Sequence, residues 1–165
     1  MQGMLCNNLK NMKSMGGNGS YQREFHRIAD SKRDFVAIDE RIDNHKILVS
    51  KDKPSHSKTP MNSNSATMYL CAKVDKNGNI VIDTIAFYHK HKITKSIDLK
   101  FDANGDAIAF KSGDENSSHA HKWHNIKPGV RGRKSHDTSN FLPTDVNRNL
   151  IQKIVQFNKM QRKWK

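Results

Sequence analysis

Alternation of hydrophobic and polar residues marks the middle of the chain as an antiparallel sheet. The segment ATMYLCAKV (66–74) is rich in strand-forming residues, and the Asn-Gly turn of DKNGN joins it to a partner strand, IVIDTIAFY. From Ile93 to Phe101 apolar and polar residues largely alternate, as in a strand with one buried face. The turn DANGD then leads into AIAF (107–110). These segments predict a meander of four consecutive antiparallel strands.

The flanking segments predict helices and one further strand. Between Tyr21 and Ile42 the apolar positions fit one face of a helix better than a strand, which predicts one or two helices; they are Phe25, Ile28, Phe35, Ile38 and Ile42. KILVS (46–50) is a short strand candidate. Thr144 can cap a final helix, whose apolar stripe would contain Val146, Leu150, Ile154, Phe157 and Trp164.

These elements predict an α+β fold in a single domain. The expected architecture is an N-terminal helix or helices, a central antiparallel meander sheet of four to five strands, and a C-terminal helix. The length of 165 residues suits one hydrophobic core. Residues 1–20 end in SMGGNGS and show little periodicity, so we expect a flexible N-terminal arm followed by one domain over 21–165.

The charge balance points to a polyanionic partner. Lysine and arginine outnumber aspartate and glutamate by 29 to 16, giving a formal charge of +13. Nucleic acid is the expected partner, since neutralising phosphates releases condensed counterions; the histidine chemistry below makes RNA the expected kind. A membrane is not expected because the chain has no long apolar run. Cys6 and Cys71 lack CxxC spacing, and the first residues lack a signal-peptide pattern, so we expect a cytoplasmic protein.

The segment from Gly113 to Asp137 carries most of the candidate chemistry. It has almost no apolar periodicity and predicts a long loop, with a short edge strand around His119 to Trp123. His119 and His121 would point the same way on a strand, and His124 could complete a three-nitrogen metal site. No carboxylate lies between these histidines, however, and familiar metal motifs are absent. We therefore predict no metal and no cofactor, with a histidine-ligated metal hydrolase as a further alternative.

Metal-free RNA cleavage fits this residue set better. Histidine serves as base and acid near neutral pH, and arginine stabilises a crowded phosphorane. The predicted catalytic residues are His119, His121, His124, Arg131 and Arg133. The predicted nucleic-acid-binding residues are His89, Lys90, His91, Trp123, Lys127 and Lys134.

Structural interpretations of these residues remain open beside the functional ones. The string YHKHK, which contains His89 and His91, can be a polar turn. Trp123 can anchor the loop instead of stacking on a base. The string VRGRK can contact a phosphate backbone without taking part in catalysis. His136 beside Asp137 is a weak candidate pair, because adjacent strand residues face opposite ways.

Three stretches of the second half carry a resemblance to a known class. KFDANGDAIAF, then HAHKW, then GRKSHDTSNFLPTD resemble phage-associated and polymorphic-toxin modules of the barnase/EndoU/colicin/RelE-like nucleases, over about 66–145. The resemblance implies leading helices, a four-stranded antiparallel sheet and metal-independent RNA cleavage, with His119 and His121 at its late H-x-H element. The expected function is thus an endoribonuclease toxin or phage effector with an immunity or host protein as partner. The alternative is a non-catalytic nucleic-acid-binding accessory or inhibitor protein.

Overall fold

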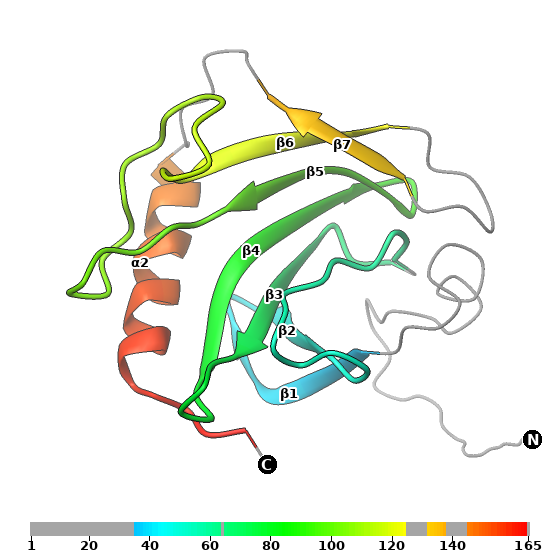
Figure 1. The fold of residues 1–165 in the computed structure, drawn as a ribbon. Coiled ribbons are helices and arrows are strands. Elements are labelled where there is room, and N and C mark those ends of the chain that lie inside the picture. The colour runs from blue at the N-terminus through cyan, green and yellow to red at the C-terminus, as the bar shows by residue number, and fades with distance from the viewer. Residues whose placement is uncertain (1–34, 64, 125–131, 138–144, 165) are drawn as a thin grey trace, which may run out of the picture.

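A seven-stranded sheet with one helix across it forms the described part of the protein (Figure 1). The computed structural model describes residues 35–63, 65–124, 132–137 and 145–164. The strands are β1 (Phe35–Ile42), β2 (His45–Ser50), β3 (Met68–Val74), β4 (Ile80–His89), β5 (Lys92–Asp98), β6 (His119–His124) and β7 (Arg133–His136), and the helix is α2 (Asp145–Lys159).

The sheet is mixed and keeps the order of the chain. Its strands follow one another from β1 to β7, with antiparallel pairing throughout except between β2 and β3, which are parallel. The β3–β4 hairpin turns at Gly78, whose φ of 82° is easily adopted by glycine. At the β4–β5 turn, both Lys90 and His91 have positive φ, the geometry of a tight two-residue hairpin loop.

The predicted fold class is wrong in two respects. Residues 35–42, predicted as the end of an N-terminal helical region, form strand β1; residues 1–34 lie outside the described part of the chain. The sheet has seven strands and one parallel pair instead of a four- to five-stranded meander. AIAF forms only isolated bridges, at Ala107 and at Phe110, and RKSH, which has no apolar signal, forms β7.

Burial on both faces of the sheet explains why β1 resembles a helix in sequence. Phe35 and Ala37 pack on one face, and Ile38 and Ile42 pack on the other face, under α2. Because both faces are covered, the apolar residues of this strand need not recur at every second position. Phe35, Ile38 and Ile42 consequently repeat at spacings that a helix also produces.

Each face of the sheet has its own hydrophobic cluster. On one face α2 packs over β4 and β1, with Ile154 fully buried among Ile82, Ile85 and Ile97. On the other face, Tyr69 and Tyr88 belong to a second cluster with Met61, which comes from the segment between β2 and β3. Within the described ranges, no helix is long and apolar enough to cross a membrane.

The Asn158 side chain of α2 hydrogen-bonds both backbone groups of Ile82 in β4, at a position that β5 does not reach. Its Oδ1 accepts from the Ile82 amide at 2.8 Å, and its Nδ2 donates to the Ile82 carbonyl at 2.9 Å. Asn158→Ala should lower the free energy of unfolding by about 1–3 kcal/mol, because both backbone groups lose their partner. Urea unfolding measures this loss, with the exposed Gln156→Ala as control. An unchanged midpoint for Asn158→Ala would show that water replaces the side chain without cost.

Candidate functional site: a histidine and carboxylate centre on β5, β6 and β7

Three histidines and two carboxylates from four segments meet on the sheet face opposite α2. We call this group the histidine centre: His119 and His121 of β6, His136 of β7, Asp98 of β5 and Glu115 of the β5–β6 connection. Ala120 points to the helix-covered cluster, and alternation along β6 therefore directs His119 and His121 to the other face.

Strand register brings these residues together. Asp98 pairs with His119 across β5 and β6, and His121 pairs with His136 across β6 and β7. Directly paired antiparallel residues project from the same face, so three strands contribute to one spot. The His121 and His136 rings stack with centroids 4.9 Å apart, and the His119 ring lies edge-on to His121 at 4.8 Å.

A tight turn supplies Glu115. Gly113 has a φ of 74°, and the Asp114 side chain accepts from the Asn116 amide at 2.9 Å and from the Ser117 hydroxyl at 3.1 Å. This local hydrogen bonding is typical of an Asx turn. The turn brings the Glu115 carboxylate to two of the histidines. Its Oε2 lies 3.3 Å from His119 Nε2, and its Oε1 lies 2.7 Å from His136 Nε2.

Asp98 lies close to both buried rings. Its Oδ2 is 3.2 Å from His121 Nδ1 and 3.6 Å from His119 Nε2, close but not aligned as hydrogen bonds. Burial opposes the charge of Asp98, but His121, Lys134 and His119 outweigh it and hold its pKa below the ordinary value. The hydrogen bond with His136 lowers the pKa of Glu115. Both carboxyl groups are therefore charged at neutral pH.

Exposure differs strongly within the centre. The His119 side chain is 0% exposed and that of His121 is 5% exposed, whereas His136 is 32% and Glu115 65% exposed. His119 and His121 form the floor of the centre, and His136 and Glu115 form its solvent-facing side. A molecule arriving from solvent would meet His136 and Glu115 first.

Lys134 and Trp123 adjoin the centre. The Lys134 ammonium lies 5.7 Å from the centroid of the Trp123 ring, within cation–π range. Trp123 is half-buried, packs against the second hydrophobic cluster and donates from Nε1 to the Ser96 hydroxyl at 2.9 Å. These contacts favour the anchoring interpretation of Trp123 over base stacking.

Other predicted site residues do not join the centre. His124 has its Nε2 2.9 Å from the Ser135 hydroxyl and pairs with the exposed Arg133 at the far end of β6. His89, Lys90 and His91 lie at the β4–β5 turn, six positions along β5 from Asp98, or roughly 20 Å in strand geometry. Lys127 and Arg131 lie outside the described residues.

Sequence reasoning missed Asp98 and Glu115 and gave little weight to His136. Asp98 is twenty-one residues from His119, and only strand pairing joins them. Glu115 precedes the HAHKWH segment and so does not lie between the histidines. His136 was assessed as a partner of Asp137, but its hydrogen bond goes to Glu115, and Asp137 instead lies 3.9 Å from Lys122.

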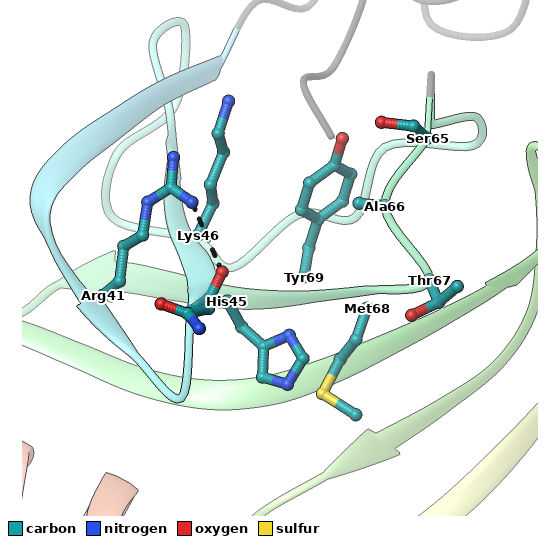
Figure 2. A pocket seen from close by; sticks show the side chains of 9 residues that line it. Arg41, His45, Lys46, Ser65, Ala66, Thr67, Met68 and Tyr69 are labelled. Carbon is teal, nitrogen blue, oxygen red and sulfur yellow. Dashed lines mark hydrogen bonds between the residues drawn. The ribbon is translucent and has the colours of Figure 1, made fainter. Parts of the chain in front are cut away.

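A basic cavity of about 260 Å³ lies elsewhere, at the β1–β3 side of the sheet (Figure 2). Arg41 and Lys46 project into the same region, and Arg41 donates to the Asn44 carbonyl at 3.4 Å. Burial lowers the pKa values of His45 and Lys46, and Arg41 lowers that of Lys46 further. The lining residues are Arg41, Asn44, His45, Lys46, Ser65, Ala66, Thr67, Met68 and Tyr69.

Comparisons with protein-family models, curated proteins and solved structures found no significant match to this chain. The geometry of the histidine centre and the charge around it are therefore the features that indicate a function.

Proposed function

We propose that the protein binds RNA at the β6–β7 side of the sheet and cleaves it at the histidine centre by imidazole acid–base chemistry. The observation that carries the proposal is the convergence of three imidazoles with Glu115 and Asp98, beside Lys134. Imidazole groups can transfer protons near neutral pH, and the cations of this strongly basic chain attract a phosphate backbone.

His136 is the residue of the centre best placed to act on RNA. Its Nε2 bonds to a carboxylate, which can only accept, so Nε2 carries the hydrogen and Nδ1 is the basic nitrogen of the neutral ring. Glu115 would stabilise the imidazolium that forms when Nδ1 takes a proton, and one third of the His136 side chain is exposed. The sequence predicts His119 and His121 as the base and acid, in either order; because the His119 ring is fully buried and that of His121 nearly so, the base proposed here is His136.

The proposed reaction conserves every atom of the substrate. His136 accepts the proton of a 2′-hydroxyl, the 2′-oxygen forms a bond to phosphorus, and the bond from phosphorus to the 5′-oxygen breaks. His121, stacked on His136, is the nearest imidazole able to return a proton to the leaving oxygen. The products are a 2′,3′-cyclic phosphate and a 5′-hydroxyl. Lys134, on the same face of β7 as His136, would bind a neighbouring phosphate, and Arg133, on the opposite face of this edge strand, would bind one farther along the backbone.

Cleavage of a single-stranded RNA in excess EDTA tests this proposal. We expect cyclic phosphate products from the wild type, a loss of roughly 100-fold or more in rate for His136→Ala, and a smaller loss for Glu115→Gln. His56→Ala is the control, since His56 is an exposed residue of the β2–β3 connection whose Nδ1 contacts Ser55. Intact RNA, or equal rates for wild type and His136→Ala, would refute acid–base cleavage at this centre.

Binding without cleavage is the second candidate function. The burial of His119 and His121 favours it, because two of the three imidazoles do not meet solvent. In this case the exposed Lys122, Arg133 and Lys134 would hold a phosphate backbone while the histidines serve the fold. RNA binding that weakens steeply with salt, with no product in any condition, distinguishes this function from the first.

A further inference from the structure

We infer that the histidine centre is a binding site for a divalent transition-metal ion such as Zn²⁺, with His119, His121, His136 and Glu115 as its ligands. One potential ligand atom from each of these residues lies within 4.8 Å of the other three. The inference concerns metal binding itself and does not depend on RNA cleavage.

The ligand types and spacings suit a tetrahedral ion. Imidazole nitrogen and carboxylate oxygen bind Zn²⁺ at about 2.0–2.2 Å, which places neighbouring ligand atoms roughly 3.3 Å apart. His119 Nε2 and Glu115 Oε2 are 3.3 Å apart, and His136 Nε2 is 2.7 Å from Glu115 Oε1. Three nitrogens and one oxygen make a donor set that zinc and neighbouring transition metals prefer over magnesium or calcium.

His119 is fixed in the tautomer that a metal needs. Its Nδ1 lies 2.7 Å from the Ser117 carbonyl, which can only accept, so Nδ1 carries the hydrogen. In the neutral ring Nε2 then has its lone pair free for coordination. A backbone carbonyl that holds the second nitrogen in this way is the usual outer partner of a metal-binding histidine.

Two buried nitrogens have unmet bonding capacity at this place. His119 Nε2 and His121 Nδ1 are both buried and make no hydrogen bond. Each faces carboxylate oxygen: His119 Nε2 faces Glu115 and Asp98, and His121 Nδ1 faces Asp98. With the hydrogen of the neutral His119 ring on Nδ1, the Nε2 lone pair faces negative oxygens, an unfavourable contact that a bound metal ion would relieve.

The local charge also favours a dication. The chain has a formal charge of +13, yet Asp98 and Glu115 bring two negative charges against three adjacent imidazoles. Protonating all three rings would place like charges at ring separations of 4.8 to 5.3 Å. One divalent ion would balance the charges of both carboxylates without that repulsion. Asp98 would lie next to the ligands without binding the ion itself.

Metal binding would displace the proton that now joins His136 to Glu115. The ion would take the place of the hydrogen between Nε2 and Oε1, and that hydrogen would move to Nδ1 of the same ring. His136 would then hold its hydrogen on Nδ1 and could no longer act as a base. Zn²⁺ is therefore expected to suppress acid–base cleavage at the same centre.

Zinc titration of the untagged, EDTA-stripped full chain tests the inference. We expect about one Zn²⁺ per chain by calorimetry and by elemental analysis after dialysis, and a visible absorption band of tetrahedral Co²⁺ when cobalt is the probe. His119→Ala, His121→Ala and His136→Ala should each weaken binding roughly 100-fold or more, since each removes a ligand. His124→Ala is the matched control, a histidine of the same strand outside the centre.

Variants at the solvent-facing side keep the test decisive if the buried histidine variants fail to fold. Substitution of the more exposed His136 or Glu115, as His136→Ala or Glu115→Gln, should weaken zinc binding while circular dichroism stays that of the wild type. Absence of stoichiometric binding, or equal affinity in wild type, His136→Ala and Glu115→Gln, would overturn the inference. RNA cleavage assays in EDTA and in Zn²⁺ are scored separately, so a failure of the nuclease proposal leaves the metal result intact.

Discussion

Replacing Ile154 with alanine is expected to lower the free energy of unfolding by about 2–5 kcal/mol. Ile154 is 0% exposed and lies at the centre of the contact between α2 and the sheet, together with Leu150 and Phe157. Truncation removes three buried carbon atoms and leaves a cavity that close-packed neighbours fill only in part. The effect is large because α2 is the one helix in the described residues that covers this face.

Equilibrium urea unfolding followed by circular dichroism measures this effect. The midpoint should fall while the slope of the transition stays unchanged, which is the signature of lost stability without a change in the unfolding reaction. Gln152→Ala is the matched control, because Gln152 is exposed on the same helix and should change stability by about 0.5 kcal/mol or less. Similar midpoints for the two variants would mean that α2 does not stabilise the sheet.

Removing Arg133 and Lys134 together is expected to weaken RNA binding by roughly 25-fold at 0.1 M salt, if each contacts one phosphate and acts through counterion release alone. Both side chains are exposed on β7, and Lys134 also lies close enough to Asp98 to lower the pKa of that carboxyl group. Each phosphate contact on a single strand contributes about 0.7 to the slope of log affinity against log salt concentration. Loss of two contacts should therefore make this slope less steep by about 1.4.

The binding measurement uses 2′-O-methyl RNA, which lacks the attacking hydroxyl and so stays intact. Fluorescence anisotropy over a range of salt concentrations gives both affinity and slope. Lys153→Ala with Lys159→Ala is the matched control: it removes the same two positive charges from α2, where these lysines pair with Asp43 and Asp106. If both double variants lose the same affinity, attraction depends on net charge and not on a β7 site. Thermal melting checks that loss of the Lys134 contact with Trp123 leaves the fold intact.

The elements predicted with success are those whose signal is local. The Asn-Gly turn and its two flanking apolar segments are sufficient to specify the β3–β4 hairpin, since turn geometry and strand propensity lie within a few neighbouring residues. KILVS is β2, and the apolar stripe of the last helix is confirmed at Leu150, Ile154 and Phe157. Trp164, which was predicted to belong to the stripe, lies beyond the end of the helix at Lys159. Its backbone amide donates to the Gly78 carbonyl.

The prediction failed where local pattern and tertiary pairing disagree. Apolar residues on both faces of β1 imitated the spacing of a helix, and AIAF, which alternates like a strand, has no continuous partner strand. RKSH carries no hydrophobic signal, yet it forms β7 because the exposed edge of β6 offers unpaired backbone groups. Strand formation at such positions depends on the available partner more than on the side chains.

The amino-acid sequence by itself determined the basic character of the protein, the central hairpin, the final helix and the position of His119 and His121 on one face of a strand. Tertiary structure alone decided which groups surround those histidines. Asp98 and His136 reach them through strand register, and Glu115 reaches them through a turn, over separations in sequence that no motif spans. The physical reason is that hydrogen bonding between strands fixes side-chain neighbours across the sheet, whereas sequence spacing describes neighbours only along one strand.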